Sequence, residues 1–356
     1  MSSHPNEYLL QGFRFEQLGS YSQALEEYRK ALDAQPQNLI TAGRYFRLLR
    51  DMRPDAPEGL KLIWQIDPGG ACWESDWVRF LISGLDYTEI IDGKYRELHD
   101  GAIVVDNQIG PQRRPYYFEM LQRGNRFALI HLSDEHYGDD ASIYNFANLV
   151  LRNYWSRAHA ADKCVIGIPL GLMNGFKVET SPSTFERRYV WSFAGNTAKR
   201  AREEMLTAMS WVKGGHVHAT SAINPRVLTS EQRDATDAPL PVEDYARLLS
   251  DTIFAPCPAG WENLDSFRVC EALEAGCIPI VQRRPFFDYF EHLFGDHPML
   301  SVASWSEAPA LIASLQKDRG ALDRRRVACA RWWRDYRASL APMVRDRIRQ
   351  SFTATV

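Results

Sequence analysis

Arg268 lies in the first turn of a helix that the sequence predicts between a cap at Asp265 or Ser266 and an end at Gly276. The N-terminus of a helix carries partial positive charge, so a cation there is disfavoured unless an anion shares the site. Glu271 follows three residues later, on the same helix face. A diphosphate beside Arg268 would satisfy the arginine, and two ribose hydroxyls would satisfy the carboxylate. The pair therefore indicates a nucleotide-diphosphate ligand.

The loop before this helix supports an anion site. Residues 256–265 read PCPAGWENLD, and a helix N-terminus that follows a loop rich in Pro and Gly presents free backbone N–H groups. The alternative is a weak surface ion pair between Arg268 and Glu271. The apolar strands predicted on both sides of the helix disfavour this alternative, because they would bury it.

The same segment resembles the donor-site signature of the exostosin family of glycosyltransferases. Residues 266–281 read SFRVCEALEAGCIPIV, and YARLLSDTIFAPCPAG precedes them at 245–260. Upstream, WSFAGN at 191–196 and the basic residues after it are similar to the family's F-x-G segment. The matching positions in the first two stretches are Tyr245, Leu248, Phe254, Pro258, Gly260, Ser266, Phe267, Arg268, Glu271, Ala272, Leu273, Ala275, Cys277 and Pro279.

The resemblance implies a GT-B fold, in which two Rossmann-like domains face a cleft, and an inverting transfer from a UDP-sugar. The sequence contains no Asp-x-Asp motif. We therefore expect no metal cofactor, and a leaving diphosphate that protein groups stabilise, Arg268 among them. The expected donor-binding residues are Gly195, Asn196, Lys199, Arg200, Pro258, Gly260, Ser266, Phe267, Arg268 and Glu271.

Inversion also requires a base that deprotonates the acceptor hydroxyl. Asp134 and Glu135 follow a predicted buried strand of the first domain, where the fold would place the acceptor. One of these two carboxylates is the expected base, with His131 and His136 as further candidates, and Arg152 could orient the carboxylates. In the alternative interpretation, Asp134 caps the next segment and Glu135 is a solvated loop residue.

Residues 1–68 carry a pattern that resembles a tetratricopeptide unit, a helix-turn-helix of about 34 residues. In the first unit, Gly12 and Ala24 would let two helices approach, while Phe15 and Tyr28 fill the groove. So short a repeat region cannot bury its own faces, so it must pack on the rest of the chain or on a protein partner. A weaker second copy is indicated by Gly43, Phe46, Leu60, Trp64 and Pro68.

From about residue 101 the sequence alternates between strands and helices, which predicts an α/β fold with parallel sheets. A helix is expected at 143–158, between strands at 126–133 and 164–169. We predict two doubly wound domains, at 69–185 and 186–319, and a C-terminal helix at 320–356 that packs back on the first. Strands are expected at 102–107, 126–133, 164–169, 189–195, 216–221, 252–258, 277–281 and 297–304, and further helices at 198–211, 242–249 and 306–315.

The arginine-rich C-terminal helix carries a cluster of aromatic residues, which favours packing across both domains over contact with a membrane surface. A net charge of -3 argues against a nucleic-acid partner. Scattered cysteines, and no signal peptide or membrane span, indicate the cytoplasm, in solution or at the inner face of a membrane. The expected partners are a nucleotide sugar and a glycan or glycolipid acceptor in cell-surface polysaccharide synthesis. The alternatives are a protein acceptor, or a non-catalytic adaptor with a degenerate α/β body.

Overall fold

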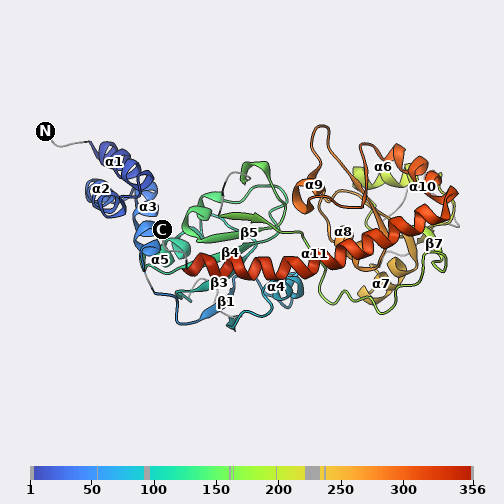
Figure 1. The fold of residues 1–356 in the computed structure, drawn as a ribbon, viewed down its shortest axis with the longest axis horizontal. Coiled ribbons are helices and arrows are strands. Elements are labelled where there is room, and N and C mark those ends of the chain that lie inside the picture. The colour runs from blue at the N-terminus through green and yellow to red at the C-terminus, as the bar shows by residue number, and fades with distance from the viewer. Residues whose placement is uncertain are drawn as a thin grey trace.

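The computed structural model contains two parallel sheets placed side by side, with a small helical region at one end (Figure 1). One long C-terminal helix runs along both sheets. The structure describes residues 4–53, 55–91, 97–159, 162, 164–197, 199–220, 233–235 and 238–353.

The N-terminal region consists of helices α1 (Pro5–Gln17), α2 (Tyr21–Ala34) and α3 (Leu39–Asp51). Gly12 faces the ring of Tyr28, and a Cβ at Gly12 would lie 2.5 Å from that ring, so the close approach expected of the first unit is present. The prediction of a second repeat copy is wrong, because Leu60 and Trp64 lie in a strand. The tetratricopeptide assignment of the first unit stays a prediction.

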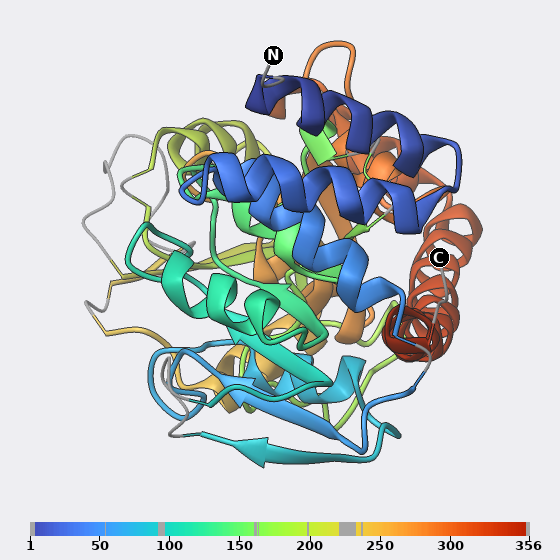
Figure 2. The same cartoon turned by 90° about the vertical axis from the view of Figure 1, so that its left-hand side faces the viewer.

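This helical region packs on the rest of the chain through α3, which contacts α5 and the 3-10 helix η1 (Figure 2). Arg50 is fully buried and donates a hydrogen bond to the carbonyl of Phe146 at 2.5 Å. A Cβ at Gly43 would lie 3.4 Å from the ring of the same phenylalanine. One face of the region is therefore covered by the first sheet's own helices.

The first sheet has the strand order β2-β1-β3-β4-β5-β6, and all pairs are parallel. Its strand order reverses between β1 and β3. The central strands β3 and β4 are fully buried on both faces, as parallel strands covered by helices are. The strands are β1 (Leu60–Trp64), β2 (Tyr87–Ile90), β3 (Ala102–Asp106), β4 (Phe127–His131), β5 (Leu149–Arg152) and β6 (Val165–Gly167), and the helices are α4 (Ser75–Leu81), α5 (Arg114–Gln122), η1 (Ala141–Phe146) and η2 (Arg157–His159).

The prediction of a helix at 143–158 is wrong. This stretch forms the end of η1, then strand β5, and then η2. A short apolar run such as 149–151 fits a buried strand as well as a buried helix, so its periodicity does not discriminate between them. The strand pairs with both β4 and β6, and these pairings decide its conformation.

The second sheet has the order β12-β11-β10-β7-β8-β9, again all parallel, which is the Rossmann order with its reversal between β7 and β10. The two parallel sheets, each with one reversal of strand order, form the expected GT-B fold. The strands are β7 (Tyr189–Gly195), β8 (Gly215–Ala219), β9 (Arg233–Ala235), β10 (Thr252–Cys257), β11 (Ile278–Gln282) and β12 (Leu300–Val302), and the helices are α6 (Arg200–Met209), α7 (Val242–Ser250), α8 (Phe267–Glu274), α9 (Tyr289–Phe294), η4 (Trp305–Glu307) and α10 (Ala308–Lys317).

The C-terminal helix α11 (Arg319–Thr353) packs against α4 of the first sheet and α8 of the second. Trp333 stacks on Trp77 at 6.1 Å, and its indole Nε1 donates to Glu274 at 2.6 Å. Arg337 pairs with the same carboxylate at 2.5 Å. The aromatic face of α11 is therefore covered by protein, as the packing interpretation expects. No helix among the described residues is long and apolar enough to cross a bilayer.

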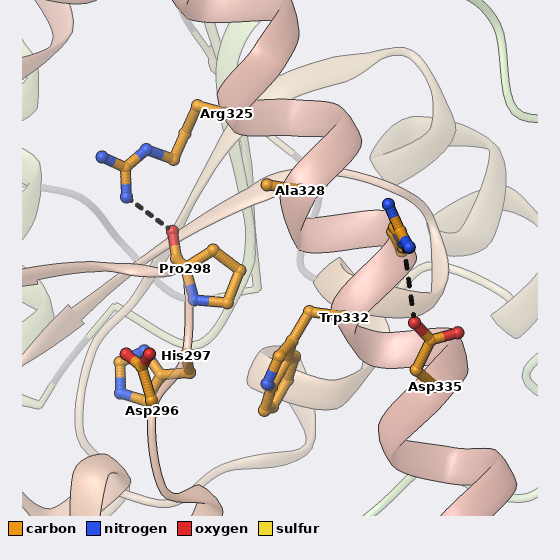
Figure 3. Close-up of a pocket in the computed structure, with 8 residues that line it drawn as sticks. Asp296, His297, Pro298, Arg325, Ala328, Trp332 and Asp335 are labelled. Atoms are coloured by element: carbon orange, nitrogen blue, oxygen red, sulfur yellow. Dashed lines mark hydrogen bonds and ion pairs between the residues drawn. The ribbon is translucent and has the colours of Figure 1, made fainter.

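An open hollow of about 470 Å³ lies beside α11, against the loop before β12 (Figure 3). Arg325 donates to the carbonyl of Pro298 at 3.1 Å, and Trp332 forms one wall. Basic and acidic side chains line it together, including Arg331 and Asp335. This mixed lining gives no preference for an anion or a cation.

Candidate functional site

The residues predicted to bind the donor gather where β7 and β10 end, at the reversal of the second sheet. Ligands of open α/β sheets bind at such a point, beyond the carboxyl ends of the strands. Arg268 in α8 donates to the carbonyl of Ala194 at 2.7 Å, and its guanidinium lies 4.7 Å from the ring centroid of Phe193. Gly195 has a φ of 137°, and a Cβ there would overlap the Arg268 guanidinium. The structure thus brings Gly195 and Arg268 together.

Three cations gather at this point without a carboxylate partner. Lys199, Arg202 and Arg268 form no ion pair with an acidic residue in the part of the chain that the structure describes. The Nε atoms of Arg202 and Arg268 are buried and have no hydrogen-bond partner. Lys199 places its ammonium 4.0 Å from the ring centroid of Trp261. We call Lys199, Arg202 and Arg268 the cation cluster.

Burial and the charges of Arg202 and Arg268 lower the pKa of Lys199 to about 8, against the opposing charge of Glu135. Burial, with the charge of Arg268, likewise lowers the pKa of Arg202 to about 10. Like charges that are partly removed from water repel one another, so the cluster is electrostatically unfavourable without a nearby anion. A bound anion would relieve this repulsion.

Arg200 does not take part in the cluster. Its side chain is 92% exposed and pairs with Glu204 on the outer surface of α6, at 2.9 Å. Arg202 faces the site instead, and its NH1 donates to the carbonyl of Asn196 at 2.7 Å. The arginine that faces the site is therefore two residues after the predicted one.

Two buried carboxyl groups flank the start of α8. Burial raises the pKa of Glu271 to about 7, although the charge of Arg268 lowers it, and burial also raises the pKa of Asp265 to about 7. Glu271 Oε1 and Asp265 Oδ1 have no hydrogen-bond partner. The other Asp265 oxygen accepts the N–H of Leu170 at 3.1 Å. Glu271 therefore has a carboxyl oxygen free to accept a ligand hydroxyl.

The N-terminus of α8 has no side-chain cap. Ser266 is the N-cap residue, but its hydroxyl makes no capping hydrogen bond and is buried without a partner. The cap expected from Asp265 or Ser266 is therefore absent, which leaves the first N–H groups of α8 for another acceptor. Phe267, the first residue of α8, is half-buried, and Pro258 lies buried directly after β10.

Glu135 reaches from the first domain into the loop before α8. Its Oε1 accepts the backbone N–H groups of Trp261 at 2.5 Å, Glu262 at 3.0 Å and Asn263 at 3.3 Å. A Cβ at Gly260 would overlap the same oxygen, so a larger residue there would displace the Glu135 carboxylate. Glu135 is therefore neither free nor merely solvated: its charge is held in a nest of backbone amides.

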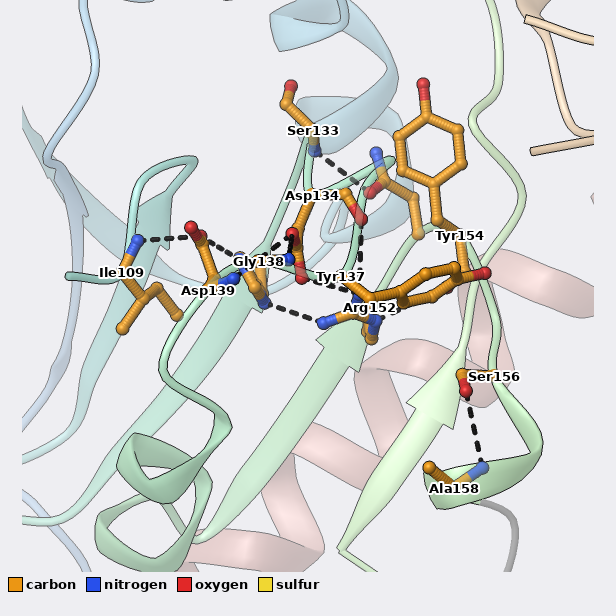
Figure 4. Close-up of polar contacts among 12 residues, drawn as sticks. Ile109, Ser133, Asp134, Tyr137, Gly138, Asp139, Arg152, Tyr154, Ser156 and Ala158 are labelled. Atoms are coloured by element: carbon orange, nitrogen blue, oxygen red, sulfur yellow. Dashed lines mark hydrogen bonds and ion pairs between the residues drawn. The ribbon is translucent and has the colours of Figure 1, made fainter. Parts of the chain in front are cut away.

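Asp134 is a buried, paired carboxylate (Figure 4). One oxygen accepts from Arg152 at 2.8 Å, and the other accepts the N–H groups of Gly138 at 2.8 Å and Asp139 at 3.3 Å. Asp134 thus caps the following turn, as the alternative interpretation holds, and Arg152 does orient a carboxylate.

His131 is buried between Tyr144 at 2.6 Å and Asp139 at 2.8 Å. Burial lowers its pKa, against the opposing influence of Asp139. His131, Asp134 and Asp139 lie close enough to share a metal ion. The guanidinium of Arg152 already supplies positive charge there, so these residues suit the arginine better than a metal ion. His136, the fourth candidate base, is exposed.

Several solved structures are similar to this chain. A Thermobaculum terrenum O-GlcNAc transferase mutant has 11% identity and a TM-score of 0.49, over 99% of this chain and 85% of that one. T4 phage BGT in complex with UDP and Mn²⁺ has 13% identity and a TM-score of 0.47, over 82% and 99%. Anabaena Alr3699/HepE in complex with UDP-glucose has 10% identity and a TM-score of 0.49, over 81% and 98%. A sequence comparison with curated proteins gave no match.

The family model of the Exostosin GT47 domain matches residues 123–298. The chain is exostosin-like over this segment. The match supports an exostosin-like glycosyltransferase, as the sequence resemblance implies. The exostosin-like segment contains the loop of Asp134 and Glu135, the whole cation cluster, and α8, so it includes the contacts that join the two domains here.

Sequence reasoning missed Glu74, which lies outside the exostosin-like segment. It is 3% exposed and directly precedes α4. Burial raises its pKa to about 7. Its Oε1 accepts from the Nδ2 of Asn153 at 3.4 Å, and no cation pairs with it among the described residues. Nothing local marks Glu74 in the sequence, since only tertiary packing buries it.

Tyr154 connects Glu74 to the interdomain contacts. Burial raises its pKa, and the charges of Glu135, Asp265 and Glu74 raise it further, so its hydroxyl lies within electrostatic reach of all three carboxyl groups. Tyr154 has a positive φ of 53°, and so does Tyr137 in the facing loop. Left-handed backbone at non-glycine residues is costly and concentrates at functional sites.

Proposed function

We propose that this protein is an inverting glycosyltransferase that transfers a sugar from a UDP-sugar to a hydroxyl of a glycan acceptor, in the synthesis of a cell-surface polysaccharide. One observation carries the proposal: three cations meet at the strand reversal of a Rossmann-type sheet and form no ion pair with a described acidic residue, with Arg202 buried and Lys199 and Arg268 half-buried. A nucleotide diphosphate supplies the missing negative charge.

In this proposal, the diphosphate binds the cation cluster and the uncapped N-terminus of α8. Glu271 accepts hydrogen bonds from the ribose hydroxyls. As the bond between the anomeric carbon and the diphosphate oxygen breaks, negative charge grows on the leaving group. Preorganised cations stabilise that charge, which is typically the largest contribution to catalysis. We propose that this replaces a metal cofactor.

The attacking hydroxyl needs a proton acceptor, and we propose Glu74 for this role instead of Asp134 or Glu135. Asp134 is paired with Arg152, and Oε1 of Glu135 accepts three backbone amides, so both carboxylates are already engaged in this conformation. Glu74 accepts from Asn153 but has no cation partner among the described residues, and a pKa of about 7 suits a base at neutral pH. The hydroxyl oxygen forms the new bond to the anomeric carbon while its proton passes to Glu74.

Calorimetric titration with UDP tests the donor site. We expect Arg268→Ala to abolish binding and Glu271→Ala to weaken it strongly. Arg200→Ala is the matched control, because Arg200 lies in the same basic motif but outside the cluster, and it should bind as the wild type does. Unchanged isotherms for Arg268→Ala and Glu271→Ala would refute the site.

A protein acceptor is the second candidate, favoured by apolar side chains on the outer surface of the helical region. Leu18 is 76% exposed and Ile40 is 69% exposed. In that case, Leu18→Lys combined with Ile40→Lys should abolish transfer to protein in a cell extract while leaving hydrolysis of the donor unchanged. A non-catalytic adaptor would show neither hydrolysis nor transfer with any nucleotide sugar.

A further inference from the structure

A small pocket of about 200 Å³ opens between the two domains, near the amide nest that holds Glu135. This volume is below the range of about 300–1,000 Å³ that drug-sized ligands occupy, so the pocket suits one small ring. Both domains contribute to it. The lining residues are Tyr137, Trp155, Ser156, Arg157, Asn263, Leu264, Arg284, Phe287 and Tyr289.

Aromatic side chains form fixed walls around this pocket. The rings of Trp155 and Phe287 stack at 5.9 Å with an angle of 16°. The hydroxyl of Tyr137 donates to the carbonyl of Trp155 at 3.1 Å and accepts from Asn263 Nδ2 at 2.5 Å. Tyr289 accepts the backbone N–H of Trp155 at 3.0 Å. These bonds join the two domains and hold the rings in place before any ligand binds, which reduces the entropy cost of binding.

Two arginines at the pocket have no acidic partner. The guanidinium of Arg157 lies 4.8 Å from the ring centroid of Phe287, and Arg284 donates to the carbonyl of Glu262. Neither forms an ion pair with a carboxylate within the described ranges. Exposed guanidinium groups with free donors favour planar or tetrahedral oxyanions, which they bind through paired hydrogen bonds.

A second, more open hollow of about 530 Å³ shares Arg284 and Phe287 with the pocket and continues to the surface. It adds a third arginine, Arg283, which also lacks an acidic partner among the described residues. Asp288 and Glu291 line it too, but Asp288 is committed to capping α9, where it accepts two backbone N–H groups. Together the two hollows form a groove that a chain of sugars can follow outward, with a net positive lining.

Phe286 stands at the outer end of this groove. Its side chain is fully exposed, and its φ is 61°. A bulky residue in left-handed backbone is a costly arrangement, and it persists where function requires it. An exposed ring beside arginines suits the apolar face of a sugar that carries a negative substituent.

We propose that this groove binds the acceptor, and that the acceptor unit in the interdomain pocket is a sugar with an anionic substituent. That the groove binds an acceptor rests on the proposed function. The preference for an acidic sugar rests on the aromatic walls and the unpaired arginines alone. Arg157 and Arg284 hold the anion, and Trp155 and Phe287 contact the ring.

Ligand-observed NMR with the full chain tests the proposal. The probes are methyl glucuronide and glucose 6-phosphate, with methyl glucoside as the neutral control. We expect either acidic probe to bind at least about tenfold more tightly than the glucoside, the effect of one charge-assisted hydrogen bond. Arg157→Gln combined with Arg284→Gln should remove this preference. Arg331→Gln combined with Arg334→Gln, two exposed arginines on α11, is the matched control and should not.

Arg157→Gln alone is the second variant if the double variant does not fold, because Arg157 is exposed and its side chain makes no hydrogen bond within the part of the chain that the structure describes. Equal binding of the neutral probe, no binding of either acidic probe, or binding unaffected by both Gln variants would overturn the proposal. A repeat titration with saturating UDP separates the sites. Acidic probes that stay bound support an acceptor site, whereas their displacement would place the pocket in the donor site. Absence of UDP binding would instead count against the proposed function alone.

Discussion

Glu135 of the first domain accepts the backbone N–H of Trp261 in the second domain at 2.5 Å, and the same carboxyl oxygen also accepts from the next two residues. One side chain thus fixes the loop that leads into α8. The ammonium of Lys199 lies over the ring of Trp261, so this interdomain contact extends to the cation cluster. The orientation of the two domains and the geometry of the proposed donor site are therefore coupled through this carboxylate, together with the bonds of Asn263 to Tyr137 and of Trp155 to Tyr289.

Glu135→Gln tests this coupling. An amide oxygen accepts N–H groups less strongly than a carboxylate does, so we expect the backbone amides of 261–263 to exchange hydrogen faster and the donor KM to rise several-fold. Hydrogen-exchange mass spectrometry measures the first effect. Glu262→Gln, in the same loop, is the control, because its side chain makes no hydrogen bond among the described residues. Unchanged exchange in Glu135→Gln would show that the nest does not depend on the charge.

Gly195→Ala tests the position of Arg268. A Cβ would overlap the guanidinium, so we expect Arg268 to be displaced and UDP affinity to fall by at least about tenfold. The substitution also introduces backbone strain of about 1–3 kcal/mol, because the φ of this residue is positive. Gly175→Ala isolates that strain, because Gly175 has a φ of 76° but nothing near its Cβ position. It should lower the melting temperature and leave UDP affinity intact.

The carboxyl groups of Glu74, Asp265 and Glu271 predict how stability depends on pH. Each has a pKa raised to about 7 by burial, so the folded protein binds more protons than the unfolded chain between about pH 4.5 and 7. The stabilisation is complete below the unfolded pKa and is lost as pH rises through the folded value. Each group contributes a slope on the order of 1 kcal/mol per pH unit.

We therefore expect Glu271→Gln to unfold in more denaturant than the wild type at pH 8, where the wild-type carboxylate is charged and buried. The same variant should bind UDP more weakly, since an amide accepts hydroxyl hydrogen bonds less well. Urea unfolding at pH 5 and pH 8 measures the first effect. A variant that is less stable than the wild type at pH 8 would contradict the burial of an uncompensated charge.

Glu74→Gln tests the proposed base. We expect kcat to fall by about 10²–10⁴-fold, the usual contribution of general base catalysis, with UDP affinity unchanged. In the wild type, kcat should rise with pH through about 7 as Glu74 loses its proton, and the variant should lack this rise. Asp134→Asn should unfold more easily instead, because it leaves Arg152 buried without its partner. A full pH dependence in Glu74→Gln would assign the base elsewhere.

The parts of the fold that sequence predicts well are those with strong local signals. The helix and strand around Arg268 follow from a cap, an apolar pattern and a glycine, and α8 and β11 occupy nearly the expected residues. Strand β5 was not predicted because the short apolar run 149–151 fits a buried strand as well as a buried helix. Arg202 was confused with Arg200 because the inward face of α6 depends on where that helix begins. Glu74 and Asp265 became important only through burial between distant segments, which no local pattern encodes.

Lys199 should gain a proton when the donor binds. Its pKa is lowered to about 8, so about half of the protein carries a neutral amine at pH 8. A diphosphate beside it favours the charged form and raises this pKa, so binding of UDP at pH 8 should take up as much as about half a proton. Calorimetry in buffers with different ionisation enthalpies measures the uptake. Lys199→Met, which keeps a long side chain over Trp261, should show much less. Equal uptake in the variant, or proton release in the wild type, would exclude Lys199 from the diphosphate site.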